Sequence, residues 1–148
     1  MTGTGLEELS VAACWDRLEV ARVGRVAFLA DDFPIVFPVN FRVVQTGGRP
    51  HWLVIRTRPG TLLDQATLPV ALQIDEFDSA VRGGWSVLVR GTLHHVDPDA
   101  ADFRERFDPD PWLTDDRDAW LVIEPFAVSG RNLAGVAAEW AFRHDAYL

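Results

Sequence analysis

The sequence predicts a mainly β fold, an antiparallel barrel of six strands with short helices. Apolar residues alternate with polar or small ones in six segments, and turn-forming residues separate most of these segments in hairpin order. No repeat, low-complexity tract or Pro/Gly-rich linker divides the 148 residues, so we expect a single domain over 1–148. An open α+β sandwich is the alternative that the pattern leaves.

The six predicted strands are bounded by turn and proline positions. They are Arg25–Ala30, Ile35–Val44, Trp52–Thr57, Val70–Asp75, Trp85–Val96 and Trp120–Ile123. Asp31–Pro34 and Thr46–Gly48 are typical of turns. Because proline cannot donate a ladder hydrogen bond, Pro38 implies a bulge or an edge inside the second strand. Gly91 predicts a bend in the fifth.

Short helices are expected between the strands. Ser10 is a plausible N-cap, and behind it Val11, Cys14, Trp15 and Leu18 form one apolar face. Cys14 on that face is read as a small buried hydrophobe rather than a reactive thiol. Further helices are expected from Thr61 to about Leu68 and from Asp97 to about Phe107, with Asp108–Asp118 as an acidic loop. We expect a core of about 20–131 and a C-terminal tail, 132–148, whose pattern is compatible with a helix.

Composition limits the partners of the chain. The net charge of −8 argues against nucleic acid, because phosphate binding needs a basic surface. All 14 basic residues are arginine, so lysine chemistry is excluded and any bound anion must be held by arginine, hydroxyls or backbone amides. No apolar run approaches a membrane span, and the first ten residues do not resemble a secretory signal. The single cysteine excludes an internal disulfide, and we expect a cytoplasmic protein without membrane contact.

One segment has the composition of an anion site. In Arg56-Thr57-Arg58-Pro59-Gly60-Thr61, a predicted strand ends and a predicted helix begins. The free N–H groups of a helix N-terminus attract anions, and two arginines and two threonine hydroxyls add donors there. A phosphate fits this cluster. A capped turn with solvated arginines is the alternative.

Two other segments contain candidate ligand contacts. Asn40 lies inside a predicted strand, where a buried amide must be paired, so it either caps a neighbouring strand or meets a ligand that has both donors and acceptors. Gly83-Gly84 before Trp85-Ser86 allows close backbone approach, and Ser86 offers a hydroxyl. This second segment could also be a plain hairpin.

The histidines and acidic residues do not indicate a metal site. His94 and His95 are adjacent in a predicted strand and therefore face opposite sides. The acidic clusters lack the calcium-loop pattern. We expect no bound metal.

Five segments form an ordered set along the chain: Val23–Phe28, Pro38–Phe41, Arg56–Thr57 with Gly60–Thr61, Trp85–Gly91 and Ser129–Arg131. This set resembles the pyridoxamine 5′-phosphate oxidase-like flavoproteins, which have an FMN-binding split barrel. Together they span about three quarters of the chain. The chain looks closest to the small bacterial branch that is related to nitroimidazole-resistance proteins.

The resemblance implies an FMN lying between two subunits. The implied phosphate contacts are Arg56, Thr57, Thr61 and Ser86, with Arg58 as a further donor; Val39 and Asn40 lie along the ring, and Trp85 and Val87 complete the pocket, with the partner subunit's Trp120 or Arg131 as further walls. The family usually has a lysine after the Gly-Thr pair, where this chain has Leu62. Loss of that cation would weaken phosphate binding by about 1–3 kcal/mol, and Arg58 could substitute for it.

The resulting expectation is a homodimeric FMN-dependent oxidoreductase that acts on a small molecule. The cofactor would perform the electron transfer, so no catalytic acid or base is expected. A deazaflavin-dependent reductase of the same fold is the alternative. A cofactor-free or haem-handling binding module is a third hypothesis, raised by Leu62 in the lysine position.

Overall fold

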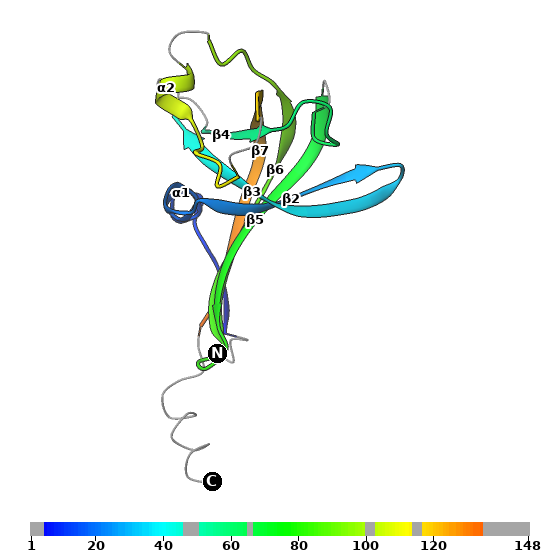
Figure 1. Cartoon of the computed structure of the whole chain (residues 1–148). Coiled ribbons are helices and arrows are strands. Elements are labelled where there is room, and N and C mark those ends of the chain that lie inside the picture. The colour runs from blue at the N-terminus through cyan, green and yellow to red at the C-terminus, as the bar shows by residue number, and fades with distance from the viewer. Residues whose placement is uncertain (1–4, 46–50, 65–66, 100–102, 114–116, 135–148) are drawn as a thin grey trace, which may run out of the picture.

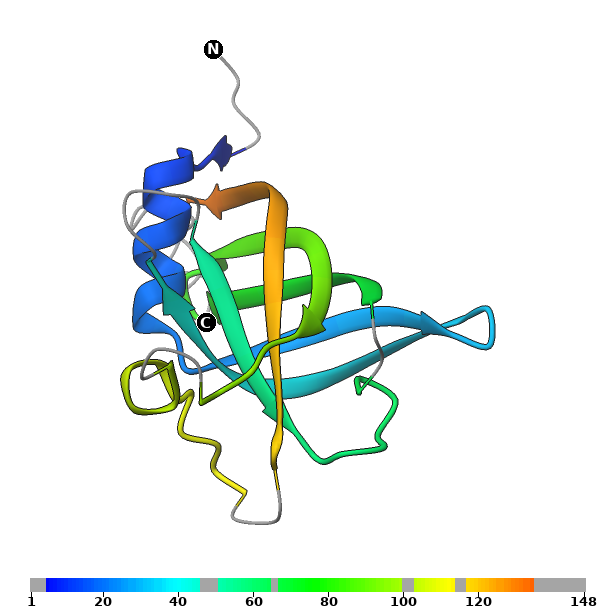
Figure 2. The same ribbon diagram turned by 90° about the horizontal axis from the view of Figure 1, so that it is seen from above.

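The predicted six-stranded barrel is confirmed. A computed structural model describes residues 5–45, 51–64, 67–99, 103–113 and 117–134. Its elements are β1 (Leu6–Glu8), α1 (Val11–Val20), β2 (Val23–Ala30), β3 (Phe33–Val44), β4 (Trp52–Thr57), β5 (Thr67–Asp78), β6 (Gly83–His95), α2 (Phe103–Phe107) and β7 (Ala119–Leu133). The sheet order is β1-β7-β4-β3-β2-β5-β6, and β6 also pairs with β7. This last pairing closes β2 to β7 into a ring, which excludes the open sandwich (Figures 1 and 2).

The first helix forms as its capping and spacing predict. The Ser10 hydroxyl accepts a hydrogen bond from the Ala13 N–H, and Cys14 and Leu18 are fully buried. Burial raises the pKa of the Cys14 thiol, which keeps it protonated and unreactive. A Cβ at Gly130 on β7 would lie 2.7 Å from the Cys14 Sγ, so glycine at that position lets α1 pack onto the barrel.

The last strand differs from its prediction. It runs from Ala119 to Leu133 instead of Trp120–Ile123, and it pairs along its length with β4, β6 and the short β1, which the sequence pattern did not indicate. Pro125 interrupts the alternation that the sequence shows, but the pairing continues on both sides of it. Leu133 therefore belongs to a strand. The expected tail helix otherwise lies outside the described residues, as does the turn at Thr46–Gly48.

Two apolar clusters hold the elements together. The larger one fills the barrel and includes α1, while the smaller one packs Val44, Val54, Trp120 and Val122 against Phe103 and Phe107 of α2. The predicted bend at Gly91 is present as a register shift between β6 and β7, where a Cβ would lie 2.4 Å from the Glu124 carbonyl oxygen. Within the described residues, no helix is long and apolar enough to cross a membrane.

The divergence of β3 and β4 creates the space for a site. The two strands pair only from Phe41–Ile55 to Val44–Trp52. Before Phe41, β3 continues beside β2, and after Ile55, β4 continues beside β7. Pro38 therefore lies where β3 has a free side, which confirms the predicted edge at proline.

The predicted helix from Thr61 to Leu68 is wrong. Residues 58–64 form turns, and β5 already begins at Thr67. Gly60 has a positive φ of 79°, and the Asp64 side chain accepts a hydrogen bond from the Gly60 N–H. These two features close a tight turn before a helix can start. The second expected helix is described as α2, which begins at Phe103.

Candidate functional site

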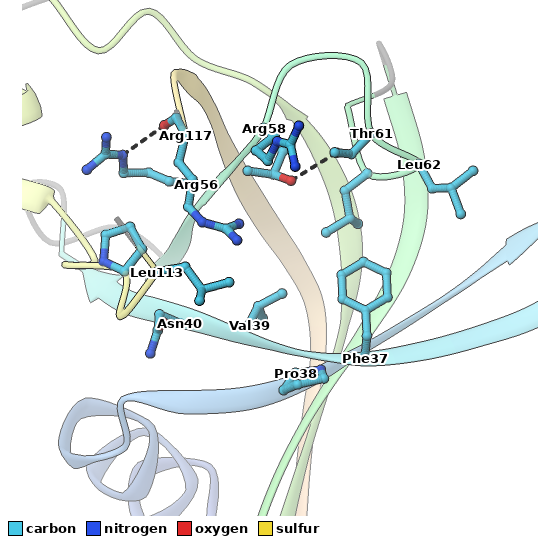
Figure 3. Close-up of a pocket in the computed structure, with 13 residues that line it drawn as sticks. Phe37, Pro38, Val39, Asn40, Arg56, Arg58, Thr61, Leu62, Leu113 and Arg117 are labelled. Atoms are coloured by element: carbon cyan, nitrogen blue, oxygen red, sulfur yellow. Dashed lines mark hydrogen bonds between the residues drawn. The ribbon is translucent and has the colours of Figure 1, made fainter. Parts of the chain in front are cut away.

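A pocket of about 390 Å³ lies in the fork between β3 and β4. Its lining residues are Phe37, Pro38, Val39 and Asn40 from β3; Arg56 and Thr57 from β4; Arg58, Thr61, Leu62 and Leu63 from the loop after β4; and Pro111, Leu113 and Arg117 from the segment before β7. Figure 3 shows the loop residues facing those of β3 across the pocket. The fold thus brings together Val39, Asn40, Arg56, Thr57, Arg58 and Thr61, all predicted from the sequence.

Hydroxyl and guanidinium groups gather on one side of the pocket. The Oγ1 atoms of Thr57 and Thr61 lie 2.9 Å apart, within hydrogen-bond distance. Thr57 is buried, whereas Arg58 and Thr61 are exposed. The opposite side is apolar, with Phe37 and Val39 half-buried. An anion with an apolar extension matches this division of the lining.

The Arg56 side chain is held by the protein itself. Its Nη1 donates to both carboxylate oxygens of Asp108, at 3.1 and 3.2 Å. Its Nε donates to the Arg117 carbonyl at 3.1 Å (Figure 3). Its guanidinium also stacks on the Trp120 ring. Arg56 therefore contributes positive charge to the pocket wall, part of which Asp108 neutralises.

Asn40 is engaged at both ends of its amide. Its Nδ2 donates to the Arg22 carbonyl at 3.2 Å, and its Oδ1 accepts from the Trp112 N–H at 2.9 Å. Of the two interpretations of Asn40, the structure therefore supports the structural one. The side chain fixes the segment that carries Pro111 and Leu113 against β3.

The loop after β4 is anchored by a carboxylate that the sequence did not single out. Asp64 accepts from the Gly60 N–H at 2.6 Å and from the Nε2 of His95 on β6. The hydrogen bond from Gly60, then the one from His95, holds the pKa of Asp64 below its ordinary value. The N–H groups of Gly60 and Thr61 are both used inside the loop, so they do not form the expected helix N-terminus.

Three predicted contacts lie elsewhere on this chain. Trp85, Ser86 and Val87 are on β6, away from the pocket. Val87 is fully buried in the core, because β-strand alternation turns it into the barrel. The Arg17 guanidinium lies over the Trp85 ring, 4.4 Å from the ring centre. Ser86 is half-buried, and its backbone is paired with Asp75 on one side and Arg131 on the other.

Sequence reasoning missed the third wall of the pocket. Pro111, Leu113 and Arg117 lie in the segment that the sequence predicts to be an acidic loop, and no local pattern relates them to β3. The two Asp-Pro pairs of this segment and exposed Trp112 were the available signals. Within the described residues, no three His, Cys, Asp or Glu side chains are grouped to hold a metal ion.

Known proteins with the same fold include flavin-binding ones. An uncharacterised protein of Mycobacterium tuberculosis is 34% identical over 115 residues, which cover 72% of each chain. The solved structure of an FAD-binding protein from Mycobacterium smegmatis is 29% identical, with a TM-score of 0.61 over 86% of this chain and 97% of that one. A conserved protein of unknown function from Corynebacterium diphtheriae is 26% identical, with a TM-score of 0.71 over 88% and 99%.

The family assignment combines topology and sequence. The closed ring from β2 to β7 is shared with these structures, and residues 10–132 match the pyridoxamine 5′-phosphate oxidase family. This match covers α1 and the strands of the ring, except for the last residue of β7, Leu133. The chain therefore belongs to the pyridoxamine 5′-phosphate oxidase family.

Proposed function

We propose that this chain binds a flavin nucleotide in the pocket between β3 and β4 and is a flavin-dependent oxidoreductase that acts on a small molecule. The observation that carries the proposal is the meeting of Arg56, Thr57, Arg58 and Thr61 with the apolar side of β3 around one pocket. A bound flavin supplies the electron transfer, and the protein supplies binding and orientation. We also propose, from the family resemblance, that the chain belongs to the bacterial branch that is related to nitroimidazole-resistance proteins.

The donor set fits a phosphate. Arg58 and Thr61 are exposed at the pocket, and the Thr57–Thr61 hydroxyl pair has acceptor and donor capacity beyond its mutual hydrogen bond. FMN ends in such a phosphate and is the cofactor we propose. FAD contains the same isoalloxazine, ribityl and phosphate groups, and the Mycobacterium smegmatis relative is described as FAD-binding.

The planar ring would extend along β3 from this phosphate. Val39 and Phe37 offer half-buried apolar contacts there. We propose that a second copy of the chain covers the ring, because the pocket is lined partly by exposed residues, Pro38, Arg58 and Leu62, and so is open to solvent in one protomer. Trp85 and Ser86 lie outside their own pocket and are available to the second copy, whereas buried Val87 is not.

Cofactor identification after gentle purification tests the proposal. We expect a flavin-type visible spectrum, with mass spectrometry of the released cofactor distinguishing FMN from FAD. If the protein purifies colourless, FMN, FAD and deazaflavin are added separately. The compound that binds should raise the Tm of the protein. A rise with deazaflavin alone supports the alternative reductase. No response to any of the three compounds overturns the proposal.

A further inference from the structure

We propose that Asp64 and His95 are positioning residues, which hold the loop after β4 in the shape that grips a phosphorylated ligand. The inference rests on the proposed flavin-binding function. Neither residue lines the pocket. Their effect on binding would come entirely through Arg58, Thr61, Leu62 and Leu63, the loop residues that do.

The Asp64 carboxylate organises the loop from within. One oxygen accepts from the Gly60 N–H at 2.6 Å, and the Asp64 N–H donates to the Thr61 carbonyl at 3.0 Å. Thr61 in turn donates from its N–H to the Arg58 carbonyl at 3.3 Å. Through these hydrogen bonds, Asp64 closes the turn that contains the pocket-lining residues Thr61, Leu62 and Leu63.

His95 ties that turn to the barrel. It is the last residue of β6, where its backbone is paired with Leu121 of β7, and its Nε2 donates to the second oxygen of Asp64. Asp64 and His95 are 31 residues apart in the sequence. The Asp64–His95 pair therefore fixes the loop to the closed part of the sheet, in addition to the Thr57–Thr61 hydroxyl contact and buried Leu63.

A fixed loop favours binding for an entropic reason. Ordering a backbone residue on binding costs conformational entropy, and a preorganised loop has already lost that entropy before the ligand binds. Gly60, with its φ of 79°, would otherwise add conformational freedom beside Arg58 and Thr61. Loss of the Asp64–His95 contact should thus weaken ligand binding more than its effect on global stability predicts.

The neighbouring histidine provides a matched control. His94 faces the other side of β6, where its Nε2 lies 3.5 Å from Glu124 and its ring packs edge-on against Trp52. It does not contact the loop in the described structure. His94→Ala and His95→Ala therefore remove the same side chain from adjacent positions of one strand, and only the second affects the pocket.

The test compares flavin affinity with stability in wild type, His94→Ala, His95→Ala and His95→Gln. Flavin dissociation constants are measured by fluorescence titration with FMN and with FAD, and stability by urea unfolding. We expect His95→Ala to bind about tenfold more weakly, and His94→Ala to bind like wild type despite a comparable loss of stability. His95→Gln should restore most of the affinity, because its amide can donate to Asp64 from a similar position.

The outcomes separate the two proposals. Equal affinity of His95→Ala and wild type overturns the positioning role and leaves flavin binding standing. Equal weakening by His94→Ala and His95→Ala also overturns it, since the effect would then follow stability. A wild-type protein that binds neither flavin overturns the proposed function and this inference together.

Discussion

Arg56 and Asp108 form a bridge between β4 and the segment that follows α2, with the Arg56 Nη1 donating to both Asp108 oxygens at 3.1 and 3.2 Å. The Trp120 ring lies beneath the same guanidinium, 4.8 Å from it, and only 18% of the Arg56 side chain is exposed. Arg56, which the family resemblance implies as a phosphate contact, thus also joins two walls of the pocket. A ligand phosphate and Asp108 would therefore both contact the Arg56 guanidinium.

Arg56→Ala should weaken both flavin binding and the fold. Removal of the guanidinium removes its hydrogen bonds to Asp108 and to the Arg117 carbonyl, so we expect a loss of about 1–3 kcal/mol in the free energy of unfolding. Affinity for FMN should fall strongly because the pocket loses a cation. Titration and urea unfolding measure the two effects.

Arg25→Ala is the control for that substitution. Its ion pair with Asp75, at 2.9 Å, lies outside the pocket, and the Arg25 side chain is 54% exposed. We expect a stability change below about 1 kcal/mol and unchanged flavin affinity. Wild-type FMN affinity in Arg56→Ala would mean that the phosphate lies elsewhere.

Leu62→Lys should strengthen FMN binding. Leu62 lines the pocket and is 52% exposed, so a lysine there needs no burial of its charge and adds a cation near the proposed phosphate. We expect a gain of about 1 kcal/mol, or about fivefold in the dissociation constant. Val20→Lys, at an exposed position outside this pocket, adds the same charge without the gain. A large loss of affinity in Leu62→Lys would show that Leu62 packs against the ligand instead.

Asn40→Ala should release the segment that carries Leu113. The substitution removes the acceptor of the Trp112 N–H and the donor to the Arg22 carbonyl, so we expect a destabilisation of about 1–2 kcal/mol in urea unfolding. Gln45→Ala removes an exposed hydrogen bond to Glu19 and should cost less. An equal effect of both substitutions would contradict the anchoring role of Asn40.

Asp64→Asn should change how stability depends on pH. The pKa of Asp64 is held below its ordinary value by the Gly60 and His95 donors, so its charged form stabilises the fold at pH values above the unfolded-state pKa. That contribution disappears as the pH falls through the lowered folded-state pKa. Wild type should exceed Asp64→Asn by about 1 kcal/mol near pH 7, and the difference should shrink toward about pH 3. A difference that is constant over this range would contradict the prediction.

Local patterns predicted most of the elements because their causes are local. The Ser10 cap, the apolar face with Cys14 and Leu18, and the alternation in β2 to β6 depend on residues a few positions apart. The helix expected after Thr61 failed because a competing interaction, Asp64 with Gly60 and His95, came partly from a distant strand. The length of β7 was missed since its stability comes from pairing with β4 and β6 rather than from its own alternation.

The amino-acid sequence was enough to predict the six-stranded antiparallel fold, the family, and the Arg-Thr-rich segment and β3 residues that meet in one pocket. The contacts of those side chains became clear only in the folded barrel. In the barrel, Asn40 accepts a hydrogen bond from the Trp112 N–H, Arg56 donates to Asp108, and Val87 is buried in the core. The reason is physical: strand periodicity is written in neighbouring residues, whereas the partner of a polar side chain depends on which distant segments the closed barrel brings beside it.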